Sequence, residues 1–377
     1  SDMARAPLDR AGAGGSAQPG SGLRLSEILL PVQVIGLGAV AMAIPAGHGL
    51  AVGDWDQAAP FLYAGGVFLT ITVFLAIATH GTVPRNRART HLLTLLGAFT
   101  VLPAMLAVPF TEAVRTTSYF NGYFEMLSAL TTTGATLFEP GRLSPTVHLW
   151  RATVGWMGGF LMWVAAIAIL APLNLGGYEV LSRAPAGTPE RIDRPGQSRE
   201  RRGRVARHAV RLAPIYAGLT GLLWLGLVIL GEVPLVAACH AMSVLATSGI
   251  SPVGGLQNAE AGMPGELLVA VFFVFALTRA SFSAEAARGR ARRLLRDPEL
   301  RIALSLTLLV PSLLFLRHWV GAYEVDMVAD LESALRALWG SAFNVVSFLS
   351  TTGFVSADWD TAQAWSGLAT PGLILLG

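Results

Sequence analysis

Residues 127–135 read LSALTTTGA, and this short stretch decides the fold because it puts hydroxyl groups and a glycine into a largely apolar chain. The pattern returns as MSVLATSGI at 242–250 and as VSFLSTTGF at 346–354. Each copy has the same surroundings: a long apolar run, a short apolar segment, the polar stretch, a loop and another apolar run. A unit that recurs in this way predicts a structural element that recurs in the fold.

The long apolar runs predict membrane-spanning helices. About 20 residues suffice for a helix to cross ~30 Å of hydrocarbon, and runs of this kind lie near 28–52, 59–79, 91–110, 147–171, 212–231, 265–284 and 302–320, with another beginning near 364. Hydrophobic residues make up 53% of the chain and charged residues only 14%, against roughly 25% charged in soluble domains. The ten-residue alternation of a membrane barrel is absent, so we expect an all-α, multi-pass membrane protein surrounded by lipid.

Arginine clusters predict the orientation. They lie at Arg5 to Arg24, at Arg85 to Arg89, at Arg183 to Arg211 and at Arg288 to Arg301. Threading the runs in order puts all four clusters on one face, which the positive-inside rule makes cytoplasmic. We therefore expect an N-terminus on the inside and no nucleic-acid partner, since topology explains the basic residues without one.

The short apolar segment before each polar stretch predicts a re-entrant helix. Residues 119–130 would form ~18 Å of helix, about half of the hydrocarbon thickness. The backbone that follows would then be irregular at mid-depth, which is tolerated only where it is buried in protein or lines a watery path. Carbonyls there can replace the water around a cation, as in a selectivity filter. The predicted ion-binding residues are Thr132, Thr133, Gly134, Thr247, Ser248, Gly249, Thr351, Thr352 and Gly353.

A polar residue stands three positions before the serine shared by the three copies. These residues are Glu125, His240 and Asn344, and we expect them to support the filter by hydrogen bonds. The alternative explanation of small and hydroxyl residues is close helix packing. We assign that role to Gly155, Gly158 and Gly159, which lie inside a full-length span, because three copies in one register favour the filter for the others.

These motifs resemble the TrkH/KtrB/HKT superfamily of potassium transporters, with bacterial TrkH closest. The matching stretches are LTTTGAT at 130–136, VGWMGGF with AILAPLNLGG within 154–177, HAMSVLATSG at 240–249, and SAFNVVSFLSTTGF with SADWD at 341–360. The resemblance implies span–pore helix–filter–span repeats around a pseudo-fourfold pore, preceded by two extra helices. Gly134 occupies the place where a serine accompanies sodium transport in some plant members, so it looks like the potassium-preferring form. The resemblance also implies a homodimer and a cytosolic, nucleotide-binding, TrkA-like regulatory subunit.

The repeats divide the chain into five parts. We expect a disordered cytoplasmic N-terminus at 1–25, two N-terminal transmembrane helices at 26–82, and a first pore repeat at 83–182. A second repeat with its arginine-rich cytoplasmic linker follows at 183–287, and a third repeat, incomplete at its second span, at 288–377. The family's gating loop and fourth repeat are absent from this chain.

The function expected from the sequence is channel-like uptake of potassium across the bacterial inner membrane through backbone carbonyls. Potassium is the ion expected, with no organic cofactor and no other metal. No catalytic motif is present, which argues against an enzyme. The alternative is a sodium-coupled secondary transporter for another cation or a small solute, although its repeats would usually be inverted.

Overall fold

The computed structural model describes residues 29–80, 87–166, 204–277, 298–323 and 331–360. The expectations for the N-terminus at 1–25, for most of the arginine-rich linker and for the run near 364 lie outside these residues. In the described part of the chain all regular secondary structure is helical, with no strand. Together with the apolar helices, this confirms the predicted all-α membrane fold.

Every predicted span that precedes residue 323 overlaps a helix of the structure. The full-height elements are α1 (Leu30–Ala41) with α2 (Ala43–Ala51), α3 (Trp55–Ala78), α4 (Arg87–Thr100) with α5 (Leu102–Val114), α7 (Pro145–Ala165), α9 (Arg204–Ile229), α11 (Gly262–Leu277) and α13 (Pro298–Tyr323). The polar stretches follow α6 (Tyr119–Leu130), α10 (Pro234–Ala246) and α14 (Leu331–Leu349).

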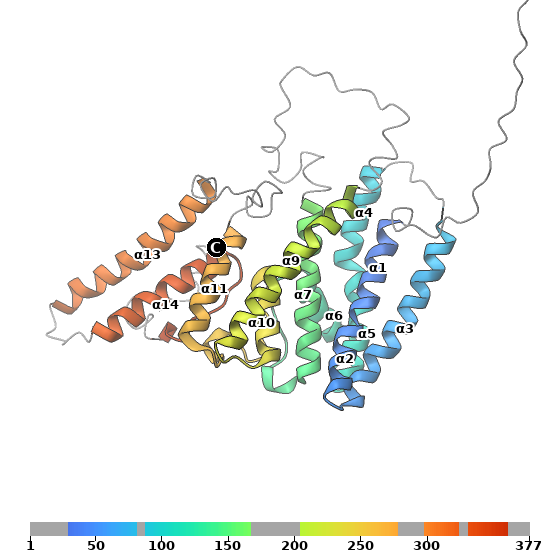
Figure 1. Ribbon diagram of the computed structural model, residues 1–377, viewed down its shortest axis with the longest axis horizontal. Helices are drawn as coiled ribbons and strands as arrows, with labels where there is room; N and C mark the ends of the chain where they lie inside the picture. The colour runs from blue at the N-terminus through green and yellow to red at the C-terminus, as the bar shows by residue number, and fades with distance from the viewer. Residues whose placement is uncertain (1–28, 81–86, 167–203, 278–297, 324–330, 361–377) are drawn as a thin grey trace, which may run out of the picture.

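Successive long helices run in opposite directions. In Figure 1 the N-terminal ends of α1, α4, α9 and α13 and the C-terminal ends of α3, α7 and α11 all lie at the upper edge. Four stretches of the described residues are long and apolar enough to cross a membrane, namely Leu30–Ala51, Trp55–Ala78, Leu92–Val114 and His208–Ile229. The upper edge is the one where the predicted cytoplasmic arginine clusters begin or end.

Two of the three helices that precede the polar stretches have the predicted half length. Helix α6 has 12 residues and α10 has 13, so each is too short to cross the hydrocarbon. The expectation of a half-length helix is wrong for the third copy, because α14 has 19 residues. Its first turns carry the exposed residues Glu332 and Arg336, with Arg336 Nη2 lying 2.9 Å from Glu332 Oε1, and the buried residues Ala334 and Ala337. The charged residues interrupt the apolar pattern, so the helix begins before the part that the sequence pattern detected.

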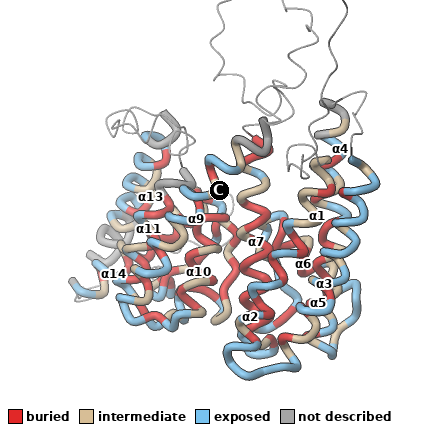
Figure 2. Tube along the Cα trace, turned by 45° about the vertical axis from the view of Figure 1, so that its right-hand side comes forward, coloured by how far each residue is buried: buried red, intermediate tan, exposed pale blue. Residues whose placement is uncertain are grey.

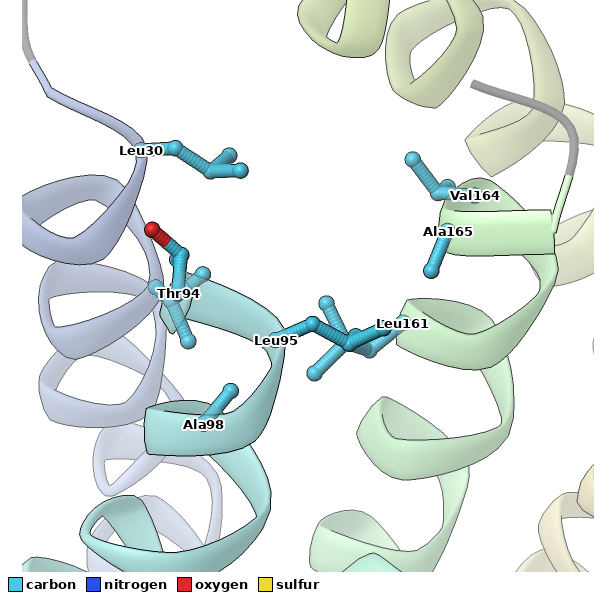
Figure 3. A pocket seen from close by; sticks show the side chains of 8 residues that line it. Leu30, Thr94, Leu95, Ala98, Leu161, Val164 and Ala165 are labelled. Atoms are coloured by element: carbon cyan, nitrogen blue, oxygen red, sulfur yellow. The ribbon is translucent and has the colours of Figure 1, made fainter. Parts of the chain in front are cut away.

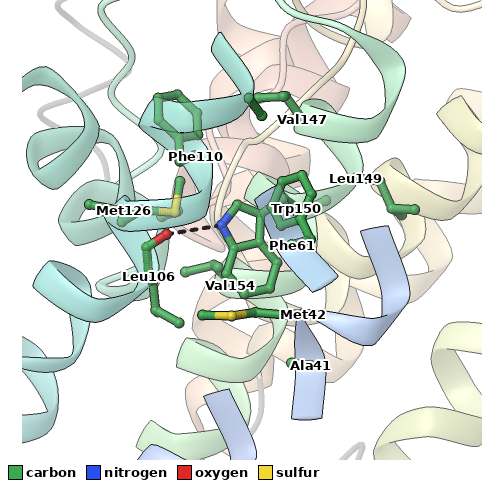
Figure 4. Packing of buried hydrophobic residues seen from close by; sticks show 14 of the residues in the cluster. Ala41, Met42, Phe61, Leu106, Phe110, Met126, Val147, Leu149, Trp150 and Val154 are labelled. Carbon is green, nitrogen blue, oxygen red and sulfur yellow. Dashed lines mark hydrogen bonds between the residues drawn. The ribbon is translucent and has the colours of Figure 1, made fainter. Parts of the chain in front are cut away.

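The buried core lies around α6, α7 and α10, whereas α3 is largely exposed on its outer side (Figure 2). Trp150 of α7 is fully buried, and its indole Nε1 donates to the carbonyl of Leu106 in α5 at 3.2 Å (Figure 4). The ring of Phe61 in α3 meets the Trp150 ring edge-on, with centroids 5.6 Å apart. The Trp150 side chain therefore connects α3, one of the N-terminal helices, with α5 and α7.

The glycines of α7 pack against the ends of the re-entrant helices. A Cβ on Gly158 would collide with the carbonyl of Leu130, the last residue of α6, and a Cβ on Gly159 would stand 2.9 Å from Ala246, the last residue of α10. A Cβ on Gly155 would stand 2.9 Å from Ile250, just after the second polar stretch. The packing role predicted for these glycines is confirmed, and it brings the first two polar stretches to one helix.

Candidate functional site

The three polar stretches share an unusual backbone. Four residues other than glycine have positive φ in the described chain, and three of them are Thr132 (57°), Thr247 (51°) and Thr351 (62°). A β-branched residue in this region is a true outlier, and such strain persists only where the surrounding structure enforces it. The glycine two positions later, 134, 249 or 353, again has positive φ, whereas the residue between has negative φ. Alternating signs of φ turn successive peptide planes so that their carbonyls face one side.

In each stretch, a backbone amide donates a hydrogen bond to a carbonyl of the preceding helix. Thr133 N donates to the carbonyl of Ser128 at 2.9 Å, and Ser248 N and Thr352 N donate to the equivalent carbonyls of Ser243 and Ser347 at 3.0 Å. The serine shared by the three copies therefore ties each stretch to its helix end. Within the described residues, no hydrogen bond reaches the carbonyl oxygens of 132–134, 247–249 or 351–353, so these oxygens are left for another partner.

Successive stretches touch through their glycines. A Cβ on Gly134 would collide with the carbonyl oxygen of Ser248, and a Cβ on Gly249 would stand 2.5 Å from the carbonyl oxygen of Thr352. Glycine is needed at both places, because any side chain would displace the neighbouring backbone. The first stretch thus adjoins the second, and the second adjoins the third, in the order of a ring. We refer to residues 132–134, 247–249 and 351–353 as the three filter segments.

Hydroxyl groups brace two of the filter segments internally. Thr131 Oγ1 lies 2.8 Å from Thr133 Oγ1, and Ser350 Oγ lies 2.9 Å from Thr352 Oγ1. The middle copy has alanine at the first of these positions, and Ser248 Oγ instead lies 3.2 Å from Ser243 Oγ. These hydroxyl contacts therefore hold the backbone of the stretches in place.

The predicted support residues occupy equivalent places in the three copies. Glu125 Oε2 accepts from Leu137 N at 3.1 Å, and Asn344 Oδ1 accepts from Ser356 N at 2.9 Å, each twelve residues further along the chain. His240 Nε2 lies 2.8 Å from Ser251 Oγ, eleven residues along. Each of them holds the segment that leads away from its filter segment, and all three are buried.

Two residues of α7 complete the first of these supports. Arg151 Nη2 lies 2.7 Å from Glu125 Oε1, and both side chains are almost fully buried. Arg151 Nη1 lies 3.5 Å from His148 Nδ1, and His148 Nε2 lies 2.9 Å from the carbonyl of Pro140. Sequence reasoning missed Arg151 as a partner, although an arginine inside an apolar span was the available signal.

Glu266 of α11 was also missed. Its carboxylate accepts from Trp339 Nε1 at 2.9 Å and from Ser356 Oγ at 2.7 Å, and also from Ala357 N. Glu266 is buried, and the described residues place no Arg or His within ion-pair distance of it. It joins the second span of the middle copy to the segment after the third filter segment.

Other parts of the molecule offer no comparable site. Among the described residues, no group of His, Cys, Asp and Glu could hold a metal ion. A small pocket between α1, α4 and α7 is lined by apolar side chains and by Thr94 (Figure 3). Thr94 is the only polar residue of this lining, and its hydroxyl donates to the carbonyl of Thr90 at 2.7 Å, so the pocket lacks the several oxygen atoms that surround a bound cation.

Comparisons with known proteins identify similar chains, although no protein-family model matches. The chain is 32% identical over 277 residues to the Trk system potassium uptake protein TrkI of Halomonas elongata, covering 73% of this chain and 51% of that protein. It is 30% identical over 342 residues to TrkH of the same organism, covering 84% and 64%, and 30% identical over 327 residues to TrkH of Salmonella typhimurium, covering 83% and 63%. The chain thus spans between half and two thirds of the length of these relatives.

The fold is similar to that of a solved transporter. The crystal structure of the potassium transporter TrkH from Vibrio parahaemolyticus superposes with a TM-score of 0.67 at 26% sequence identity, covering 89% of this chain and 66% of that one.

Proposed function

The chain belongs to the TrkH/KtrB/HKT superfamily of potassium transporters, and from this premise we propose that it takes part in potassium uptake through its three filter segments. The observation that carries the proposal is the row of unpaired carbonyl oxygens on strained, glycine-adjoined backbone, repeated in three copies. Carbonyl oxygens replace the water shell of a bare cation, and this needs no side-chain charge.

In the proposed path, potassium enters from the face opposite the arginine clusters and loses its water among the carbonyls of the filter segments. A fourth filter segment would close the ring beside Gly353. Inward movement follows the membrane potential, which contributes ~2.3 kcal/mol per elementary charge per 100 mV. The sites proposed for the ion are Thr132 to Gly134, Thr247 to Gly249 and Thr351 to Gly353, with Glu125, His240 and Asn344 as supports.

The proposed setting is the bacterial inner membrane with the N-terminus inside. The named relatives are components of Trk systems, which supports a regulatory partner for this chain as well. We place a TrkA-like nucleotide-binding subunit at the face that carries the arginine clusters, and a second copy of the chain as the dimer partner. The division into two N-terminal helices and pore repeats at 83–182, 183–287 and 288–377 belongs to the same proposal.

The test is growth at limiting potassium in a bacterium that lacks its own potassium uptake systems. The host carries the complete open reading frame, or this frame with Gly134→Ser or Gly353→Asp, and membrane expression is checked for each. The matched control is Gly141→Ser, because Gly141 lies in the loop after the first filter segment with no atom near its Cβ position and an ordinary φ.

Rescue by the wild type and by Gly141→Ser, with loss in both filter variants, is the expected result. Growth that survives Gly353→Asp would show that the filter segments do not line the path. If the wild type itself fails despite good expression, adding the regulatory subunit distinguishes a missing partner from a different substrate.

A further inference from the structure

The segment after the first filter segment is held at two points by one chain of buried side chains. Starting from Leu137 N, the contacts run through Glu125, Arg151 and His148 and end at the carbonyl of Pro140. Both ends lie in the same short segment, 137–140, so the three side chains hold this segment at two points. We refer to Glu125, Arg151 and His148 as the bracket.

The contacts fix the hydrogen positions of the bracket. A guanidinium can only donate, so His148 Nδ1 must accept from Arg151, and the imidazole proton then lies on Nε2 and is donated to the Pro140 carbonyl. Glu125 accepts from Leu137 N through Oε2, and its Oε1 lies at ion-pair distance from Arg151. The bracket therefore joins a carboxyl group, a guanidinium and an imidazole, each in a different role.

The bracket holds a buried ion pair next to the segment that follows the first filter segment. The Arg151 and Glu125 side chains are 5% and 0% exposed, so water screens neither charge. At the equivalent places of the other two copies stand His240 and Asn344, with no arginine in contact among the described residues. A lone guanidinium near a cation path would repel the cation, whereas the Glu125–Arg151 pair is neutral as a unit.

We propose that Arg151 and His148 are positioning residues of the first filter segment, and that Glu125 serves mainly to neutralise Arg151 while holding Leu137. This inference rests on the proposed function. It assigns to Glu125 a task that differs from that of His240 and Asn344, because among the described residues only Glu125 of these three contacts an arginine. It also predicts an asymmetry: removing the carboxylate alone harms cation uptake more than removing the guanidinium alone.

The experiment measures rubidium uptake by cells that express the complete open reading frame, with KM and maximal rate determined separately. The variants are Glu125→Gln, Arg151→Met and the double variant. We expect Glu125→Gln to raise KM about tenfold, because it leaves an unscreened positive charge near the path. The double variant should return KM to within about threefold of wild type, because the two changes compensate.

His148 supplies a second readout. The amide of His148→Gln can still accept from Arg151 and donate to Pro140, so this variant should discriminate against sodium as the wild type does. His148→Phe can do neither, and sodium should then inhibit rubidium uptake at lower concentrations. The exposed pair Asp56–Arg115, with side chains 73% and 62% exposed, supplies the matched controls Asp56→Asn and Arg115→Met.

A double variant that is as impaired in KM as Glu125→Gln would overturn the proposal, as would equal effects of the two single changes. If Glu125→Gln does not reach the membrane, the same comparison is made on membrane abundance, because charge compensation predicts that Arg151→Met restores it and a purely steric role predicts a further loss. Failure of the proposed function is recognised separately, since the wild type itself would then take up no rubidium with its regulatory subunit present.

Discussion

The carbonyl oxygen of Ser248 occupies the space where a Cβ of Gly134 would stand. This contact joins two filter segments that are 115 residues apart at their glycines and lie on different re-entrant helices. Because of this contact, a side chain at position 134 is the change that the first filter segment tolerates least.

Gly134→Ala should therefore abolish uptake, and Gly249→Ala should reduce it strongly. In both cases the new methyl group meets backbone atoms of the next segment, and the positive φ adds a strain of about 1 kcal/mol or more for a residue with a side chain. Rubidium uptake at equal membrane expression measures the loss. Gly141→Ala is the control, and wild-type uptake by Gly134→Ala would show that the two segments do not touch in the working protein.

Gly158→Ala should destabilise the protein. Its methyl group would collide with the last carbonyl of α6, and overpacking of this kind costs about 1–3 kcal/mol. Thermal unfolding of purified protein in detergent measures the change. Gly66→Ala in α3 is the matched control, because no atom lies near its Cβ position and alanine favours a helix by about 0.5–1 kcal/mol. An equal melting temperature for Gly158→Ala and wild type would contradict the close contact between α6 and α7.

Glu266→Gln should loosen the segment after the third filter segment. The amide nitrogen cannot accept from Trp339, Ser356 and Ala357 together, and a buried donor without a partner costs about 1–3 kcal/mol. We expect a lower melting temperature together with weaker discrimination between potassium and sodium. Glu332→Gln, which changes an exposed glutamate of the same region, should leave both properties unchanged. Unaltered melting and selectivity in Glu266→Gln would show that this carboxylate does not hold the segment.

Trp150→Phe should weaken the attachment of the N-terminal helices to the first repeat. The change removes the hydrogen bond to Leu106 and part of the ring that packs on Phe61, and we expect a loss of about 1–3 kcal/mol. Unfolding by denaturant measures it, with Trp55→Phe, an exposed tryptophan at the start of α3, as the control. An unchanged free energy of unfolding in Trp150→Phe would show that this side chain does not hold the N-terminal helices.

Sequence patterns predicted the positions of the helices and many of the residues of the candidate site. Apolar length located the spans, and a repeated register located the filter segments together with Glu125, His240 and Asn344. The length of α14 was underestimated because Glu332, Ser333 and Arg336 interrupt the apolar residues of its first turns. Arg151, His148 and Glu266 were not predicted as partners because their contacts come from packing. The partner of Arg151 is 26 residues away, and that of Glu266 is 90 residues away on another helix.

Where neighbouring filter segments meet, one contributes a glycine, which has no side chain, and the other contributes a backbone carbonyl oxygen. A backbone oxygen is the same atom in every amino acid, so the residue that supplies it is free to change. Only the glycine cannot be replaced by another residue without a collision. The three segments accordingly differ as TTG, TSG and TTG behind Thr131, Ala246 and Ser350. A change of the residue that supplies the oxygen therefore needs no matching change of the glycine that it meets.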